Sequence, residues 1–534
     1  MDISYGGLSN IIDAENEGIS IYVHIPFCVR KCLYCDFLSA PADDETRENY
    51  VKSLINEIRS YRNIYGRRSV RSVFIGGGTT SVLSEDQFGR VMEALIDSFS
   101  GIAGNSIGDT AMNDVKDSSG SNVSMTDDSY MDRREKRRRS GADTEREKES
   151  KTEKQTDSHI KRAVKGETEI TIEINPGTVT RKYCALLCKL GVNRVSIGLQ
   201  SADNDELMRI GRIHTYEEFL ETYRWLREAG CKNINVDIMS ALPGQTLSGY
   251  LEGLHKILKL KPEHISAYSL ILEEGTPLYE MYRDDAVSYN KMNSGSFAGP
   301  DDFEINDNIS VLNPFVENEN GCEINSQIRG DSTEKIHSAE NGRVAGLSGG
   351  ERPAPLPGED EERRMYEETG VLLAEHGYKR YEISNYAREG FECEHNKVYW
   401  QRKDYLGIGL GASSCVGNVR WKNRDDLSGY IKLLSDAGSD HTDYDAAKLQ
   451  VEKQVLTINE QMEETMFLGL RMMRGVDRNE FRKLYGCDIT EVYGSVIDKY
   501  QRQGLLVLDN DRICLTDEGI NVSNVIFADF LLDK

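Results

Sequence analysis

The chain has 534 residues, 38% of them hydrophobic and 29% charged, so it is long enough for two or more folded domains of a soluble protein. Its formal net charge of −24 argues against broad nucleic-acid binding, which needs a basic face. Its 11 cysteines are an odd number, and we see neither a secretory signal nor the roughly 18 apolar residues of a membrane span, so we expect reduced thiols and a cytoplasmic location.

Short apolar runs rich in β-branched residues alternate with amphipathic helical patterns over the first half of the chain. Repeats of this kind imply parallel strands joined by right-handed crossovers. They predict an α/β fold, an open and partial (βα)6 barrel, with its chemistry at the C-terminal ends of the strands. The predicted strands are 20–23, 69–75, 169–174, 194–199, 233–238 and 264–270. The predicted helices are 45–65, 84–99, 180–190, 216–229 and 248–258.

Two polar stretches interrupt this order, at about 102–166 and 284–360. Neither could bury enough apolar surface to offset its ordering entropy, so both are predicted to be mobile insertions. The first contains a basic run, Arg133–Ser140, whose acidic neighbours favour a solvated tract over a nucleic-acid patch. The predicted divisions are a core over 18–283, a further region over 361–450 and a C-terminal module over 451–534.

The C-terminal module has its own pattern of elements. Glu463–Arg474 is amphipathic, and Asp477 can cap a second helix over Arg478–Tyr485. Two short apolar runs, LLVL and ICLT, then flank the turn residues Asp509–Asp511, which predicts a hairpin. Helices followed by a small hairpin predict a winged-helix-like module.

A group of three cysteines, Cys28, Cys32 and Cys35, directly follows the first predicted strand in the segment IYVHIPFCVRKCLYCDF. Thiolates hold iron–sulfur clusters, and three of them would leave one iron of a cubane open to an amino acid's amine and carboxylate. Zinc and chance spacing are the alternatives, but zinc sites prefer paired hooks and four ligands, and no second hook is evident. Cys184 and Cys188 also have C-x3-C spacing, but on a predicted helix, where packing is expected.

With this motif the sequence resembles the radical S-adenosylmethionine (SAM) superfamily, and within it the oxygen-independent coproporphyrinogen III oxidase-like branch. The resemblance implies a [4Fe–4S] cluster on the three cysteines, SAM on its open iron and an electron donor for the cluster. It also implies SAM-binding residues around the cysteines and at the ends of successive strands, in blocks such as FIGGGTTS, EINPGT and RVSIGLQS. These are Tyr22, Tyr34, Gly77, Gly78, Thr79, Glu173, Gln200, Arg212, Asp237 and Ile271.

Within that branch, the sequence is most similar to the HemW-type heme chaperones. Phe37 stands where the oxidase pattern has a fourth cysteine, and only 27 residues precede Cys28. A block with the pattern H-N-x-x-Y-W then resembles the chaperone signature and offers an imidazole and aromatic faces to a heme. Its residues are His395, Asn396, Tyr399 and Trp400. The alternatives are a hydrogen-bonded structural role for the histidine, or ligation by another residue such as Cys393.

Three functions follow from these features. The first is a heme chaperone that passes heme to an acceptor protein. The second is an enzyme that decarboxylates the propionates of coproporphyrinogen III through a 5′-deoxyadenosyl radical. The third is a radical SAM enzyme whose C-terminal module binds another protein or a nucleic acid, although the acidic balance of the chain disfavours nucleic acid.

Overall fold

The computed structural model describes residues 18–102, 168–283, 353–435 and 446–532, which all belong to one structural unit. The two predicted mobile insertions lie almost entirely outside these residues, as does the basic run at 133–140. Within the described ranges, no helix is both long and apolar enough to span a membrane.

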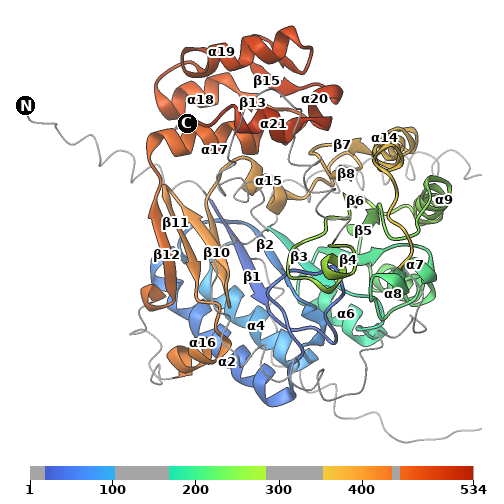
Figure 1. The fold of residues 1–534 in the computed structure, drawn as a ribbon. Helices are drawn as coiled ribbons and strands as arrows, with labels where there is room; N and C mark the ends of the chain where they lie inside the picture. Colours follow the sequence, from blue (N-terminus) through green and yellow to red (C-terminus); the bar gives the residue numbers. More distant parts are fainter. Residues whose placement is uncertain (1–17, 103–167, 284–352, 436–445, 533–534) are drawn as a thin grey trace, which may run out of the picture. The chain divides into compact units, whose positions relative to one another are not determined.

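Six parallel strands form the centre of one sheet and lie side by side in the order of the sequence. They confirm the partial barrel predicted from the alternating pattern, and each strand lies within two residues of its predicted bounds (Figure 1). The strands are β1 (Ile19–Ile25), β2 (Val70–Gly77), β3 (Glu169–Ile174), β4 (Arg194–Gln200), β5 (Ile234–Ser240) and β6 (His264–Ser269).

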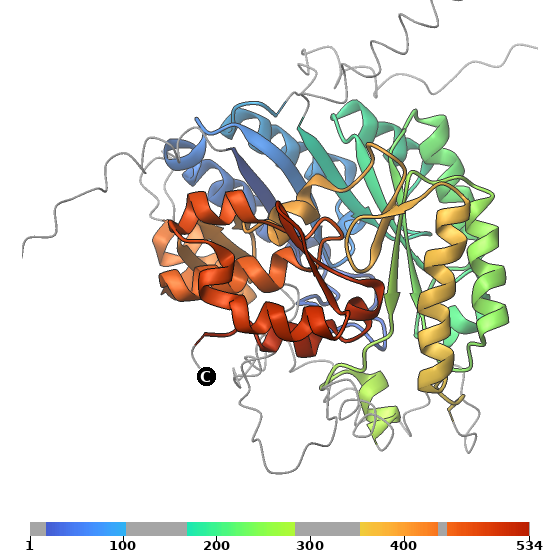
Figure 2. The ribbon, with the colours of Figure 1, turned by 90° about the horizontal axis from the view of Figure 1, so that it is seen from above.

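Helices between the strands cover the outer face of this sheet (Figure 2). Side chains such as Ser84 and Thr215 cap their N-termini by accepting from backbone N–H groups of the first turn. Their apolar faces and the outward faces of the strands form the main core. These helices are α2 (Asp44–Ser60), α3 (Arg62–Tyr65), α4 (Glu85–Ser98), α6 (Arg181–Lys189), α7 (Asn204–Arg209), α8 (Tyr216–Glu228) and α9 (Leu247–Leu258). A short helix, α10 (Pro277–Met281), follows β6 and packs against the cysteine loop.

The residues of β1 illustrate why the barrel has a polar interior. Ile21 and Val23 are fully buried in the core, whereas Ser20, Tyr22 and His24 alternate with them and face the other side of the sheet. The same alternation places polar side chains on the inner faces of the other five strands. The interior can therefore hold a charged or polar ligand, provided that these groups find hydrogen-bond partners.

The stretch 361–450, which the sequence sets apart as one region, contributes strands to both edges of the sheet. At one edge β9 runs parallel to β1 and is followed by antiparallel strands, while β8 and β7 extend the sheet beyond β6. The strands from this stretch are β7 (Lys379–Arg380), β8 (Asn385–Ala387), β9 (Tyr405–Ile408), β10 (Ser413–Val416) and β11 (Val419–Asn423). The outermost strand, β12 (Gln450–Val455), comes almost entirely from the predicted C-terminal module but pairs with β11 in this sheet. The accompanying helices are α14 (Glu359–Glu375), α15 (Glu394–Trp400) and α16 (Leu427–Ser435).

The C-terminal module contains the predicted hairpin and the predicted helix over Arg478–Tyr485, which Asp477 caps. Its first helix begins earlier than predicted, because Thr457 and Glu460 form a capping box there. The module's core also includes the end of α15. Its elements are α17 (Ile458–Gly469), β13 (Val476–Asp477), α18 (Arg478–Tyr485), α19 (Ile489–Arg502), β14 (Leu506–Leu508), β15 (Arg512–Leu515), α20 (Asp517–Asn521) and α21 (Ser523–Ala528).

A buried carboxyl group, that of Glu57 on α2, joins the barrel to the strands added beside β1. It accepts hydrogen bonds from the Gly409 backbone N–H (2.8 Å), the Asn423 amide (2.6 Å) and the Tyr430 hydroxyl (2.5 Å). Burial outweighs these donors and raises the pKa of Glu57 to about 7.

This raised pKa makes part of the folding stability depend on pH. A group whose pKa is higher in the folded state stabilises the fold at low pH, and this contribution disappears as the pH rises through about 7. Glu57→Gln should remove it, so that the stability of the wild type relative to the variant falls by up to about 3 kcal/mol between about pH 5 and pH 8. Chemical denaturation at several pH values measures this difference. The control is Glu45→Gln, an exposed position on the same helix. Identical pH slopes for wild type and Glu57→Gln would contradict the prediction.

Candidate functional site

The three cysteines lie on the loop that follows β1, at the C-terminal ends of the barrel strands, and all three are half-buried. Backbone hydrogen bonds fix the loop: the N–H of Cys28 donates to Ala40 O (3.2 Å), and that of Leu33 donates to Ile210 O (3.1 Å). The second bond joins the cysteine loop to the segment after β4. The loop is thus held between the first and fourth strands of the barrel.

Hydrogen-bond donors from the neighbouring strand ends point at the cysteine sulfurs. The Thr79 hydroxyl lies 3.6 Å from Cys28 Sγ, and Nη1 of Arg212 lies 3.5 Å from Cys32 Sγ. Donors of this kind stabilise thiolates and tune the clusters that they hold. Nε of Arg212 is also buried, without a hydrogen-bond partner in the described part of the chain. A donor set built around three thiols therefore fits an iron–sulfur cluster.

Within the described ranges, no three His, Cys, Asp or Glu side chains converge tightly enough to hold a single metal ion. A cubane cluster does not need such convergence, because each thiolate binds a different iron. Burial raises the pKa of the Cys35 thiol to about 11, while the nearby Lys31 ammonium lowers it.

Asn175 connects the residues that point at the sulfurs, although the sequence analysis did not single it out. Its amide donates to the Thr79 hydroxyl (2.7 Å) and accepts from Nη2 of Arg212 (2.7 Å). It lies in EINPGT, the block from which only Glu173 was chosen. Its position two residues after Glu173, just past the end of β3, could have indicated that it belongs to the site.

Two predicted SAM-binding carboxyl groups, Glu173 and Asp237, lie inside the barrel near this end. Glu173 accepts from the Gly77 backbone N–H (3.1 Å), and burial, with the negative charge of Asp237 as a second cause, raises its pKa to about 7. Asp237 accepts from Ser196 (3.0 Å) and Asn235 (2.7 Å), and burial raises its pKa as well. Both groups are desolvated acceptors, as expected of residues that bind hydroxyl or ammonium groups.

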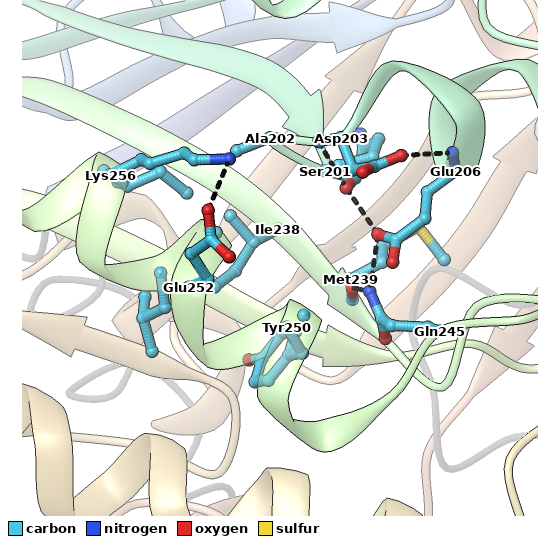
Figure 3. A pocket seen from close by; sticks show the side chains of 15 residues that line it. Ser201, Ala202, Asp203, Glu206, Ile238, Met239, Gln245, Tyr250, Glu252 and Lys256 are labelled. Atoms are coloured by element: carbon cyan, nitrogen blue, oxygen red, sulfur yellow. Dashed lines mark hydrogen bonds and ion pairs between the residues drawn. The ribbon is translucent and has the colours of Figure 1, made fainter.

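Gln200 lies beside Arg212 at the end of β4 and has a positive φ of 71°. It also lines a cavity of about 90 Å³ between β4, β5 and α9 (Figure 3). There the carboxylate of Glu206 accepts from Ser201 (2.5 Å) and Gln245 (2.9 Å). This volume suits a few water molecules rather than SAM or heme.

The structure thus brings most of the predicted SAM residues to one end of the barrel. Ile271 is exposed just beyond β6, and Tyr34 lies on the cysteine loop, where burial raises its pKa. Tyr22 lies deeper inside the barrel, where its hydroxyl is 2.9 Å from Nδ1 of His24.

The H-N-x-x-Y-W block lies elsewhere, on α15, which packs against β2 near the N-terminal end of β3. Glu169, the first residue of β3, accepts from the backbone N–H groups of Glu394 (3.1 Å) and His395 (3.2 Å). Tyr399 and Trp400 are buried, Asn396 is half-buried, and Arg471 covers the Trp400 ring at 4.7 Å. Cys393 is fully buried, with its sulfur 3.5 Å from a Glu169 oxygen.

Both ring nitrogens of His395 are already occupied. Nδ1 lies 2.9 Å from the Ser72 hydroxyl, and Nε2 lies 2.9 Å from the Tyr399 hydroxyl. Because Ser72 donates its proton to Ser20, it accepts from Nδ1–H, and Tyr399 then donates to Nε2. Burial lowers the pKa of His395 to about 3, so the ring is neutral. This geometry favours the structural role that the sequence analysis gave as the alternative to heme contact.

Comparison with known proteins agrees with this arrangement. A family model described as the radical SAM superfamily matches residues 22–257, and one for the HemN C-terminal domain matches residues 456–522. Coproporphyrinogen III oxidase (HemN) from Escherichia coli has a similar fold, with a TM-score of 0.61 at 16% identity over 99% of this chain and 94% of that one. Residues 22–257 thus match a radical SAM domain, and residues 456–522 match a HemN-type C-terminal domain.

Several relatives that match along nearly the full length are heme chaperones by name. The chain is 29% identical to the heme chaperone HemW of Lactococcus lactis over 96% of its own length and 97% of that protein's. It is 26% identical to HemW of Bacillus subtilis, over 96% and 99% of the two lengths. The predicted resemblance is thereby confirmed.

Gly78 allows a close approach between the end of β2 and the cysteine loop. A Cβ at Gly78 would lie 2.5 Å from the backbone oxygen of Phe27, so Gly78→Ala should displace the loop. We expect the variant to retain less than about half of the wild-type iron and sulfide after anaerobic reconstitution, because the thiols lose their relative positions. Gly89→Ala is the matched control, since a Cβ there meets no atom within 4 Å. Equal iron contents in the two variants would refute this account of the loop.

Proposed function

We propose that this protein is a heme chaperone that binds heme and passes it to an acceptor protein. The observation that carries the proposal is the similarity to HemW proteins along nearly the whole chain. Phe37, at the position where the oxidase pattern has a fourth cysteine, also supports it.

The proposal includes a [4Fe–4S] cluster on Cys28, Cys32 and Cys35, with SAM on the open iron. When bound, the cluster supplies one-electron chemistry to SAM. Thr79 and Arg212 donate toward two of the sulfurs and offset part of the negative charge there. The Glu173 carboxyl can accept from the ribose hydroxyls of SAM. Its raised pKa makes this role depend on pH near neutrality.

Exposed apolar side chains at the cysteine-loop end of the barrel are a candidate surface for heme. Three segments supply them, and a hydrogen bond from Arg30 to Gly211 O (2.8 Å) joins two of these segments. A porphyrin presents large apolar faces and two propionates, so apolar contacts with Arg30 and Lys31 nearby match its chemistry. The exposed apolar residues are Val29, Phe37, Met208, Ile213, Tyr268 and Ile271.

Heme contact by His395, Asn396, Tyr399 and Trp400 stays a prediction. It requires α15 to leave its present position, because the Nε2 lone pair of His395 accepts from Tyr399. The exposed surface needs no such change. We therefore place the first heme contact at the cysteine-loop end.

The first test of this function is a heme titration of the reconstituted full chain. We expect about one heme per chain with a shifted Soret band and a Kd in the micromolar range or tighter. Wild-type protein that does not bind heme at micromolar concentrations would rule out the chaperone function.

Paired variants test the proposed heme surface. Phe37→Asp combined with Ile271→Asp places two charges where apolar contact is needed, so heme affinity should fall about tenfold or more. Val507→Asp is the control, because Val507 is as exposed as Phe37 but lies on the C-terminal module. The surface is excluded if the double variant titrates like the control while His395→Ala alone abolishes the Soret shift.

A second function has support from the fold of the E. coli oxidase. If the chain were a coproporphyrinogen III oxidase, anaerobic incubation with SAM, a reductant and coproporphyrinogen III would yield protoporphyrinogen and 5′-deoxyadenosine. We expect no protoporphyrinogen from the same reconstituted sample that binds heme. Turnover comparable with that of a typical enzyme, about 1 per second or faster, would replace the chaperone proposal with the oxidase.

A further inference from the structure

A series of aromatic rings runs through the barrel interior from α15 to the cysteine loop. The ring of His395 stacks on Phe74 of β2, with centroids 5.1 Å apart and planes at 27°. Phe74 stacks in turn on Tyr22 of β1, at 6.3 Å and 29°. His395 is therefore in contact with the inner faces of both strands that lead into the site.

Hydrogen bonds continue this series into the loop. The Tyr22 hydroxyl is 2.9 Å from Nδ1 of His24, and Nε2 of His24 is 2.9 Å from the backbone oxygen of Leu38. Leu38 lies three residues after Cys35. The His24 ring also lies against the β2 end, because a Cβ at Gly77 would be 2.4 Å from it. One ring thus sets the spacing between the cysteine loop and the predicted SAM loop.

The first ring of the series has little freedom to move. His395 is 1% exposed, its ring is held by Ser72 and Tyr399, and its backbone N–H is held by Glu169. A ring fixed by three bonds can hold Phe74 in one orientation, whereas a smaller side chain would leave a cavity beside it. The Trp400 side of α15 packs instead against the C-terminal module.

We propose that His395 is a positioning residue for the cluster and SAM site and acts through Phe74, Tyr22 and His24. The inference rests on the proposed cluster at the three cysteines and is independent of heme binding. In this role the H-N-x-x-Y-W block stabilises the cysteine-loop end of the barrel through contacts in the barrel interior.

The experiment compares His395→Ala, Phe74→Leu and the double variant as reconstituted full chains. We expect each single variant to alter the EPR signal of the reduced cluster and to weaken SAM binding about tenfold. The double variant should be no weaker than the single variants, because both changes interrupt one series of contacts. His395→Gln, which keeps hydrogen-bonding groups for Ser72 and Tyr399, should restore part of the SAM affinity.

Trp400→Leu is the matched control, since it removes a buried ring from the same helix without touching Phe74. It should lower the melting temperature while leaving the EPR signal and SAM affinity unchanged. In cluster-free protein, alkylation of Cys28, Cys32 and Cys35 should be faster in His395→Ala than in Trp400→Leu, which tests the loop position without a cofactor.

Two results would overturn the inference. One is an EPR signal, SAM affinity and alkylation rate in His395→Ala that equal those of Trp400→Leu. The other is full additivity of the His395 and Phe74 variants. A wild type that binds no heme would instead remove the chaperone function, and the EPR and alkylation comparisons would still decide the role of His395.

Discussion

Polar side chains line the inner face of the six-stranded sheet, and their burial governs where loops, ligands and helix α15 can lie. Six parallel strands place one apolar face against helices, and their other face turns inward with serine, histidine, carboxyl and guanidinium groups. Arg194 on β4 is only 2% exposed. Burial opposes its charge, and the nearby carboxyl group of Glu169 favours it. Because an unpaired buried charge is strongly destabilising, the barrel must supply partners for its buried charged groups along the whole length of the strands.

The two ends of the barrel meet this requirement differently. At the N-terminal end of the strands several polar groups bond one another, although Nε of Arg194 is buried without a hydrogen-bond partner among the described residues. His264, for example, bonds Asn235 (2.6 Å) and Tyr381 (2.9 Å) through its two ring nitrogens. At the cysteine-loop end, Nε of Arg212 is buried without a partner among the described residues, and thiols and carboxyl groups face inward. The thiols distinguish this end, because they can hold a ligand beside the unpaired Nε–H of Arg212.

Much of this could be read from the sequence, for a physical reason. Runs of β-branched residues indicate the core strands, and amphipathic spacing indicates the helices between them. The bounds of both could therefore be predicted closely. Helix α15 was not predicted, because it has only seven residues and its N-terminus is capped by Glu169, which lies 225 residues away from Glu394 in the chain. For the same reason the sequence could present His395 as a heme candidate. Nothing in its local pattern reveals that Ser72 and Tyr399 occupy both nitrogens.

The role of Asn175 could not be predicted from the sequence, because it also depends on contacts with residues distant in the chain. A strand-end block indicates that a polar residue lies at the right end of the barrel, but not which of its side chains reaches Thr79 and Arg212. The cluster assignment to the three cysteines stays a prediction. Its support is the donor pattern around the sulfurs, which depends on residues from three different strand ends.

The two ends of the interruption between α4 and β3 lie together. The Thr168 hydroxyl donates to Gly101 O (2.8 Å) and to Val70 O (2.8 Å), just before β3 begins. The chain thus leaves α4 and re-enters the sheet at almost the same point, at the end of the barrel opposite the cysteines. The barrel consequently places no requirement on how many residues join these two points. The segment between 102 and 168 can therefore be lengthened, shortened or exchanged, in evolution or by protein engineering, without altering the path of any strand.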